Sequence, residues 1–465
     1  MRSLITGWKL RAGLALSVLA AALAPAASPA WAQAGANSGP RLMLIRDAET
    51  ETLLRNFANP LFRAAGVEPK LVRIILIRDD ALNAFVSTGN RMFIHTGIIA
   101  KADSALELVG VLAHEAGHIR SGHIARLPEL MREAMIKAIA AMLIGVAAGV
   151  AGGRDGAGAG IGAVLGAQSL AQRALYSFTR GMENAADQAA LQALEQVGWS
   201  ARGMTSLFGR MQEQDALVEE LQDPYLRTHP LTRDRIAFVN QHIARSRYSD
   251  APLPAGFDEA FLMVRAKLRG FLEPSSITLR RVPATDTSRP ARYARAIALY
   301  RLGHIDPALA LIDGLLAETP ASPWLHELKG QVLFEGGRGP AAVPPYREAA
   351  RLAPEQPQIR AGLARAMIEA GDKALLRPAI GHLQSALARE PDDADAWRSL
   401  GIAWGRLGDL GHADLALAEE ALLLGNIPTA RFLARRAEKQ LPAGPSRLRA
   451  VDVGNAVKKE NREGF

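Results

Sequence analysis

The sequence has 465 residues, of which 49% are hydrophobic, so it is long enough for two or three domains with sizeable cores. The formal net charge is +8, without a long basic run or a basic–aromatic alternation, and this argues against a nucleic-acid partner. The absence of cysteine excludes disulfides, thiolate metal sites and cysteine catalysis, so any metal must be held by His, Asp or Glu.

Residues 1–32 have the features of a signal peptide. The first eleven residues carry three positive charges and no acid, and an apolar run follows them. Ala30-Trp31-Ala32 then forms a small-x-small cleavage pattern. We expect cleavage after Ala32 and export of the mature chain. The alternative is an uncleaved N-terminal membrane anchor.

Residues 33–272 are predicted to form one domain that combines helices with a small β-sheet. The predicted elements are an amphipathic helix (46–66), a strand (71–77), a hairpin with a GN turn (83–97) and helices over 104–140, 167–246 and 257–272.

The helix that begins near residue 104 contains an H-E-x-x-H motif. His114 and His118 are spaced i and i+4, so both imidazoles lie on one face and can reach one metal ion. Glu115 lies next to that face and can accept a proton from a water molecule there. His123 is one residue past the shared face, and we interpret it as a helix-end or surface group. The alternative for the whole motif is the polar face of an ordinary helix.

Two uncharged runs rich in glycine and alanine follow, at 138–153 and 156–172. Each is slightly shorter than the roughly 20 residues that a helix needs to span a bilayer. The sequence leaves two interpretations open. The stretch is either a peripheral contact with a membrane or a loop or buried helix, which would serve as a lid over the metal site.

A third metal ligand is expected in the segment ENAAD. Glu183 and Asp187 lie i and i+4 on a second predicted helix. Glu183 would complete a site with two histidines and one carboxylate, which leaves a fourth position for water. Asp187 would orient a metal-binding histidine by a hydrogen bond. The alternative is an acidic, solvated helix face.

The second half of the chain repeats itself. After a polar linker over 273–288, prolines recur at 320, 354 and 391, at spacings of 34 and 37 residues, and again at 442. Alanines 308, 342, 379 and 430 each lie 12 residues before one of these prolines. This is the pattern of tetratricopeptide repeats over 289–442, with an odd last helix as a cap and a flexible tail over 443–465. The fold class is therefore mainly α (α+β), with an all-α repeat domain.

These motifs together resemble the gluzincin metalloproteases related to HtpX and the CAAX-prenyl endopeptidases. The resemblance is closest to their BepA-like periplasmic branch, which carries C-terminal tetratricopeptide repeats. The matching segments occur in the same order, at 46–49, 83–85, 96–97, 114–118, 183–187 and 228–236.

The resemblance implies further roles. Glu183 would be the third ligand of one zinc ion per chain, and His229 would lie beside the zinc and be able to plug its open position. Arg235 would lie near the cleft, so we group it with Glu115 and His229 as catalytic. The strand that carries Arg91, Phe93 and His95 would be the edge that pairs with a substrate backbone.

The sequence therefore predicts an exported zinc endopeptidase that degrades or helps to assemble envelope proteins, with the repeats for recognition. Its expected partners are unfolded or misassembled envelope proteins and the outer-membrane assembly machinery. The main alternative is a chaperone or assembly adaptor with only occasional proteolysis. A membrane-embedded prenyl-protein protease is disfavoured, because the chain lacks several apolar spans of about 20 residues.

Overall fold

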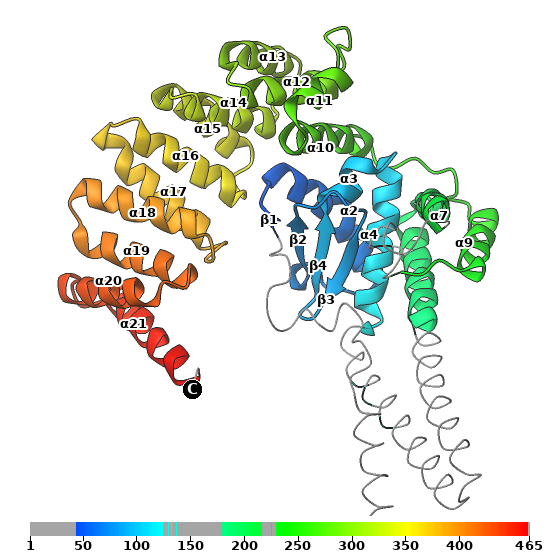
Figure 1. Cartoon of the computed structure of the whole chain (residues 1–465), viewed down its shortest axis with the longest axis horizontal. Coiled ribbons are helices and arrows are strands. Elements are labelled where there is room, and N and C mark those ends of the chain that lie inside the picture. The colour runs from blue at the N-terminus through cyan, green and yellow to red at the C-terminus, as the bar shows by residue number, and fades with distance from the viewer. Residues whose placement is uncertain are drawn as a thin grey trace, which may run out of the picture. The chain divides into compact units, whose positions relative to one another are not determined.

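The computed structural model describes residues 43–123, 179–215 and 229–463, together with the isolated positions Glu129, Arg132, Ile136 and Tyr225. The predicted signal peptide and the Gly- and Ala-rich stretch over 138–172 lie outside the described residues. The mainly helical fold with a small sheet that the sequence predicts is confirmed (Figure 1).

A four-stranded mixed sheet forms the β part of the first domain. Its strands are β1 (Leu44–Ile45), β2 (Arg73–Ile77), β3 (Ala84–Ser87) and β4 (Arg91–His95), in the order β1-β2-β4-β3. The predicted hairpin is present as the antiparallel pair β3–β4, and β2 pairs with β4 in parallel. β4 therefore lies inside the sheet and β3 at its edge.

This topology corrects the prediction that Arg91, Phe93 and His95 form the substrate edge. All three residues lie on β4, whose backbone is already paired with β2 on one side and β3 on the other. An interior strand has no free row of N–H and C=O groups, so it cannot accept a further strand. On this side of the sheet, the edge strand is β3.

The helices of the first domain pack on this sheet and on one another. They are α2 (Ala48–Ala64), α3 (Thr96–Lys101), α4 (Ala105–Arg120), a helix over 179–197, α7 (Arg202–Asp215) and α9 (Arg233–Arg245). Phe57 and Leu61 of α2 share one apolar core with Met92 of β4 and with Leu108 and Leu112 of α4. In the part of the chain that is described, no helix combines the length and hydropathy needed to cross a bilayer.

Helix α10 (Phe257–Leu272) joins the two halves of the chain. Its residues Phe261, Val264 and Leu268 belong to the core of the first domain, whereas Ala266 is buried in the core of the first repeats. The predicted linker over 273–288 contains a short helix, α11 (Ser275–Arg281). The boundary between the halves is therefore a shared helix followed by a structured connection.

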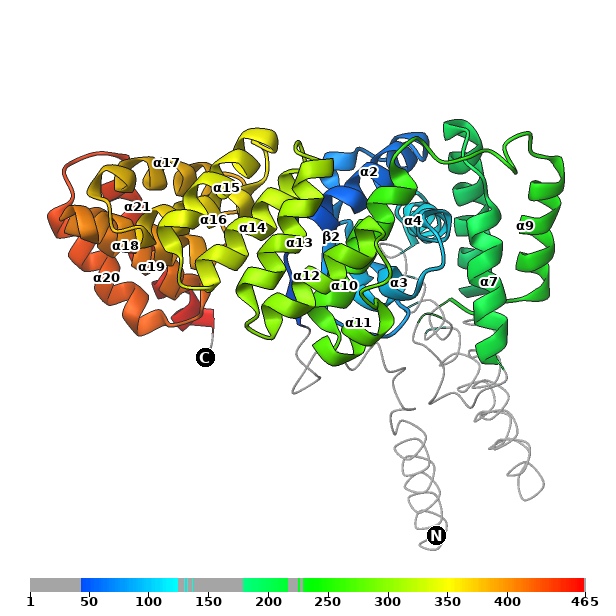
Figure 2. The same ribbon diagram turned by 90° about the horizontal axis from the view of Figure 1, so that it is seen from above.

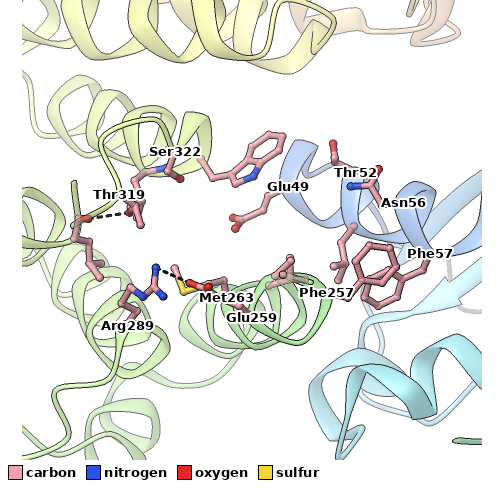
Figure 3. Close-up of a pocket in the computed structure, with 17 residues that line it drawn as sticks. Glu49, Thr52, Asn56, Phe57, Phe257, Glu259, Met263, Arg289, Thr319 and Ser322 are labelled. Carbon is pink, nitrogen blue, oxygen red and sulfur yellow. Dashed lines mark hydrogen bonds and ion pairs between the residues drawn. The ribbon is translucent and has the colours of Figure 1, made fainter. Parts of the chain in front are cut away.

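The junction also contains buried charge and a pocket. Lys267 of α10 lies 2.5 Å from Asp47 and 3.3 Å from Glu49, and the Tyr293 hydroxyl donates to Glu49 at 2.8 Å. A pocket of about 240 Å³ lies beside this group, where Phe57 stacks on Phe257 (Figure 3). None of the predicted site residues lines this pocket.

Helices α12 to α21 form the repeat domain as successive antiparallel pairs (Figure 2). They are α12 (Arg289–Arg301), α13 (Ile305–Glu318), α14 (Pro323–Glu335), α15 (Gly339–Leu352), α16 (Pro357–Glu369), α17 (Leu376–Leu387), α18 (Ala394–Leu407), α19 (Leu410–Leu423), α20 (Ile427–Gln440) and α21 (Pro445–Glu463). The four alanines that recur before the prolines are all fully buried, as tetratricopeptide packing requires.

The C-terminal residues differ from the prediction of a flexible tail and an odd last helix. Residues Pro445–Glu463 form α21, which packs on α20 and α19. The reason is the burial of two small or branched side chains, Ala450 and Val453, in clusters with Ala437 and Ala434 of α20. Helix α21 therefore completes the last pair.

Candidate metal centre

Helix α4 carries both histidines of the motif on one buried face. Its N-terminus is capped by Ser104, whose side chain accepts a hydrogen bond from the Glu107 N–H. His114 and His118 are buried, and their Nε2 atoms lie 3.1 Å apart. Two ring nitrogens that converge in this way leave one point in space that both can coordinate.

The helix over 179–197 brings a carboxylate to the same point. Glu183 Oε2 lies 3.3 Å from His114 Nε2, and Glu183 Oε1 lies 3.4 Å from His118 Nε2. The side chain of Glu183 is only 2% exposed, so this contact is made away from solvent. Two segments about 70 residues apart thus supply one cluster of donor atoms.

A close approach of the two helices makes this contact possible. Gly117 lies inside the H-E-x-x-H motif, and a Cβ atom there would be 2.4 Å from the Ala186 carbonyl oxygen and 3.0 Å from Ala186 Cα. No side chain fits at that distance from a backbone. Gly117 therefore sets the spacing at which Glu183 reaches the two histidines.

We predict that Gly117→Ala destabilises the protein by about 1–3 kcal/mol, the usual cost of overpacking a core. Without the close approach, alanine would instead stabilise a helix by about 1 kcal/mol relative to glycine. Chemical denaturation measures the difference. The control is Gly181→Ala on the partner helix, where a Cβ atom meets nothing within 4 Å. Stabilisation by both variants would contradict the packing argument.

His229 completes the cluster. Its Nδ1 lies 3.2 Å from both carboxylate oxygens of Glu183, and its Nε2 lies 3.6 Å from Glu115 Oε1. The possible ligand atoms of His114, His118, Glu183 and His229 all lie within 4.8 Å of one another. This buried group could hold a metal ion.

Glu115 supports the same interpretation. It is fully buried, yet neither carboxylate oxygen has a hydrogen-bond partner. A buried carboxylate is costly without a partner or a task. Two imidazoles and one carboxylate that converge in this way are a donor set that suits a divalent metal ion. The residues present therefore fit a metal ion.

Asp187 and Arg235 contact the cluster on the side of His114 that faces away from its Nε2. Asp187 Oδ1 lies 2.8 Å from His114 Nδ1, on the side of the ring opposite Nε2. Arg235 donates to Asp187 through Nε at 2.6 Å and through Nη2 at 3.0 Å. Its Nη1 lies 3.0 Å from Glu183 and also donates to the Pro230 carbonyl at 3.0 Å.

The grouping of Arg235 with the catalytic residues stays a prediction, and its contacts favour a supporting role beside the cluster. Its guanidinium is 2% exposed and every nitrogen already has a partner, so it is not aimed at a substrate. Instead, Arg235 links the carboxylates of Glu183 and Asp187, both on the helix over 179–197, to the loop that carries His229. Thr232 caps the N-terminus of α9, because the Thr232 side chain accepts a hydrogen bond from the Arg235 N–H.

The sequence indicates a helix-end or surface position for His123; the residue does lie just past the end of α4, but it is buried against His118. The Nδ1 atoms of the two rings are 2.9 Å apart. Helical spacing did not reveal this contact, because α4 ends at Arg120 and Gly122 turns the chain with φ +61°. The glycine at position 122, a residue that readily adopts positive φ, is the signal in the sequence that the helix ends there.

Burial and contacts set the charges of the cluster. Burial lowers the pKa of His118 to about 3. Burial opposes charge on His114 as well, but hydrogen bonds with Asp187 and Glu183 raise its pKa to about 10. Burial alone would raise the pKa of Glu183, yet His229 and the hydrogen bonds of the histidines hold it well below its usual range. Near neutral pH the metal-free cluster therefore contains a neutral His118, a Glu183 carboxylate and a protonated His114, which would have to release its proton to bind a metal ion.

Glu115 differs from Glu183 in this respect. Burial raises the pKa of Glu115, and the nearby His229 and His114 only partly offset that effect. A carboxyl group whose pKa is shifted upward from its usual value is better matched to taking and returning a proton near neutral pH.

The edge strand β3 lies beside the cluster. The His95 N–H donates to the Asn83 carbonyl at 3.0 Å, so the Asn83 carbonyl points toward β4. Because successive carbonyls of an extended chain point in opposite directions, those of the residues on either side of Asn83 point away from β4. His229 Nε2 lies 3.4 Å from one of these, the Ala84 carbonyl. The Tyr225 N–H donates to another, that of Leu82, at 3.2 Å. His229 thus contacts the outward side of β3, and Tyr225 contacts the residue two positions before that strand.

Comparison with known proteins agrees with this geometry. The family model "Peptidase family M48" matches residues 46–243. A "Beta-barrel assembly-enhancing protease" of Yersinia pestis is 25% identical over 409 residues, which cover 86% of this chain and 82% of that protein. The protein of the same description from Escherichia coli (strain K12) is 22% identical over 409 residues, which cover 86% of this chain and 81% of that protein.

Two solved structures are similar to a part of the chain. "MamA MSR-1 C2" is 18% identical with a TM-score of 0.31, and the match covers 36% of this chain and 93% of that one. "Crystal structure of YrrB: a TPR protein with an unusual peptide-binding site" is 14% identical with a TM-score of 0.31, and it covers 38% of this chain and 91% of that one.

Proposed function

We propose that the chain, whose residues 46–243 match the peptidase family M48 model, is an exported zinc endopeptidase acting on unfolded or misassembled envelope proteins. One observation carries this proposal. The buried donors His114, His118 and Glu183 converge beside Glu115, whose carboxylate makes no hydrogen bond and has only His229 at 3.6 Å. An adaptor without activity would not need a buried carboxylate that makes no hydrogen bond, and this favours real proteolysis over the chaperone alternative.

In the proposed site, His114, His118 and Glu183 hold one zinc ion per chain, and the donor set suits that metal. When bound, zinc acts as a Lewis acid that polarises a peptide carbonyl and lowers the pKa of a water molecule. Asp187 fixes the ring of His114 through its Nδ1, and Arg235 holds Asp187 and Glu183 in place.

Glu115 is the general base and then the general acid. It accepts a proton from the attacking water and returns it to the amine that leaves when the peptide bond breaks. Its neighbour His229 lies 3.6 Å away, close enough to influence that proton and the developing oxyanion.

The substrate is proposed to pair with β3. The outward carbonyl of Ala84 belongs to the edge of the sheet that borders the cluster. An extended peptide added to this edge would place its backbone beside Glu115. Only a chain without stable structure can be laid out as a strand in this way, so the proposal favours unfolded substrates.

The physiological setting follows from the features of the sequence and from the relatives. The N-terminal pattern supports export to the periplasm with cleavage after Ala32. The relatives' description as β-barrel assembly-enhancing proteases supports contact with the outer-membrane assembly machinery. The repeat domain would then recognise partners, and a peripheral contact with the membrane through the stretch over 138–172 remains part of this proposal.

The test compares two states of one substrate. An outer-membrane β-barrel protein is offered to the enzyme either unfolded or folded in detergent. We expect cleavage of the unfolded form and resistance of the folded form. Equal cleavage of both forms, or cleavage of neither while casein is cut, would contradict the proposed substrate class.

We predict that His229→Ala raises basal cleavage of casein. In the resting protein, His229 contacts Glu115, Glu183 and the edge carbonyl of Ala84, so it covers both the base and the substrate edge. Its removal should open both. The matched control is His242→Ala on α9, where the imidazole contacts Glu195 instead. A fall in activity with zinc retained would show that His229 assists the reaction.

A further inference from the structure

We propose that His123 is a positioning residue, which holds His118 in the orientation and tautomer that a metal ligand needs. This inference rests on the zinc site of the proposed function. It concerns a residue outside the H-E-x-x-H motif, and the i, i+4 spacing of a helix does not place that residue beside His118.

The geometry separates the two nitrogens of His118. Its Nε2 faces the donor group, at 3.1 Å from His114 Nε2 and 3.4 Å from Glu183 Oε1. Its Nδ1 points away from that group, to His123 Nδ1 at 2.9 Å. The two rings are nearly perpendicular, with centroids 5.1 Å apart and an interplanar angle of 73°. Both side chains are buried, so water does not replace this contact easily.

The positions of the protons follow from this arrangement. A neutral histidine that offers its Nε2 lone pair to a metal carries its proton on Nδ1. The His118 Nδ1–H therefore donates, and His123 Nδ1 must be the acceptor. His123 is then neutral with its own proton on Nε2. The opposite tautomer of His118 would leave no lone pair on the nitrogen that faces Glu183.

The two metal-facing histidines thus have different partners. His114 is held by the carboxylate of Asp187 at 2.8 Å, whereas His118 is held by a neutral imidazole. A carboxylate partner is the common arrangement and adds negative charge near the metal. A neutral partner fixes the ring without adding charge, which leaves the site more electrophilic than two carboxylates would.

Local structure explains how His123 reaches this place. Helix α4 ends at Arg120, Ser121 donates its N–H back to the Gly117 carbonyl, and Gly122 adopts φ +61°. The chain therefore turns back over the last turn of the helix. A residue five positions after His118 would point elsewhere if the helix continued.

The experiment measures zinc affinity of the whole chain by competition with a chelator. We expect His123→Leu to weaken zinc binding about 10–100-fold, the usual effect of removing a partner of a metal ligand. His123→Asn should restore most of the affinity, because Asn Oδ1 can occupy the place of His Nδ1 as an acceptor. The control His242→Leu should bind zinc like the unaltered chain.

Nitrogen-15 spectra of the histidines in the zinc-loaded chain provide a second readout that needs no variant. We expect a protonated Nδ1 on His118 and an unprotonated Nδ1 on His123. Equal zinc affinity of the Leu, Asn and unaltered proteins, or a proton on His123 Nδ1, would overturn the inference. Failure of the unaltered chain to bind zinc would instead overturn the proposed function.

Discussion

Glu115→Gln is expected to lower casein cleavage by at least about a hundredfold, the lower range for the loss of a general acid–base group. The amide keeps the shape of the side chain but cannot accept a proton. Because Glu115 is not among the converging donors, the zinc content should stay the same. The loss should therefore appear in the rate of cleavage and not in metal binding.

Metal analysis and casein cleavage of the same preparation separate these effects. Glu107→Gln is the matched control, because Glu107 is a buried glutamate on the same helix that pairs with Arg210, away from the metal cluster. Folded Glu107→Gln protein should cleave casein at the rate of the unaltered chain. Cleavage close to that of the unaltered chain by a pure Glu115→Gln preparation would show that another residue is the base.

Glu183→Ala is expected to abolish stable zinc binding and, with it, proteolysis. Removal of a residue that hydrogen-bonds to a metal ligand lowers metal affinity about 10–100-fold. Removal of a ligand itself should therefore lower zinc affinity by more than about a hundredfold. The change also removes one carboxylate partner of the buried Arg235 and should lower stability. Zinc content after gel filtration is the measurement.

Glu195→Ala is the control for this variant. Glu195 lies on the same helix, but it contacts His242 and Ser246 of the α9 region instead of the metal cluster. It should bind zinc normally. Full zinc occupancy in folded Glu183→Ala would remove Glu183 from the ligand set and would leave His229 as the candidate third ligand.

The features that the sequence predicts well depend on local spacing. His114 and His118 share a face because a helix places i and i+4 together, and the repeating alanines such as Ala342 are buried for the same kind of reason. The strands and the β3–β4 hairpin also follow from alternation and a turn signal.

The features that it misses depend on contacts between distant segments. The parallel pairing of β2 with β4 is what moves β4 into the sheet, and no local pattern reports it. Arg235 can bind the carboxylates of the helix over 179–197 only because α9 packs it against that helix. Helix α21 is mostly polar and is held by a few small contacts such as those of Ala450 and Val453, so its sequence resembles a tail.

Zinc titration of the metal-free whole chain tests the central claim most directly. Casein cleavage is followed while zinc is added in steps to the protein after chelation. The proposed site predicts no activity at the start, a linear rise, and a plateau at one zinc ion per chain. Full cleavage by the metal-free protein, or a plateau at another stoichiometry, would contradict a single catalytic zinc held by His114, His118 and Glu183.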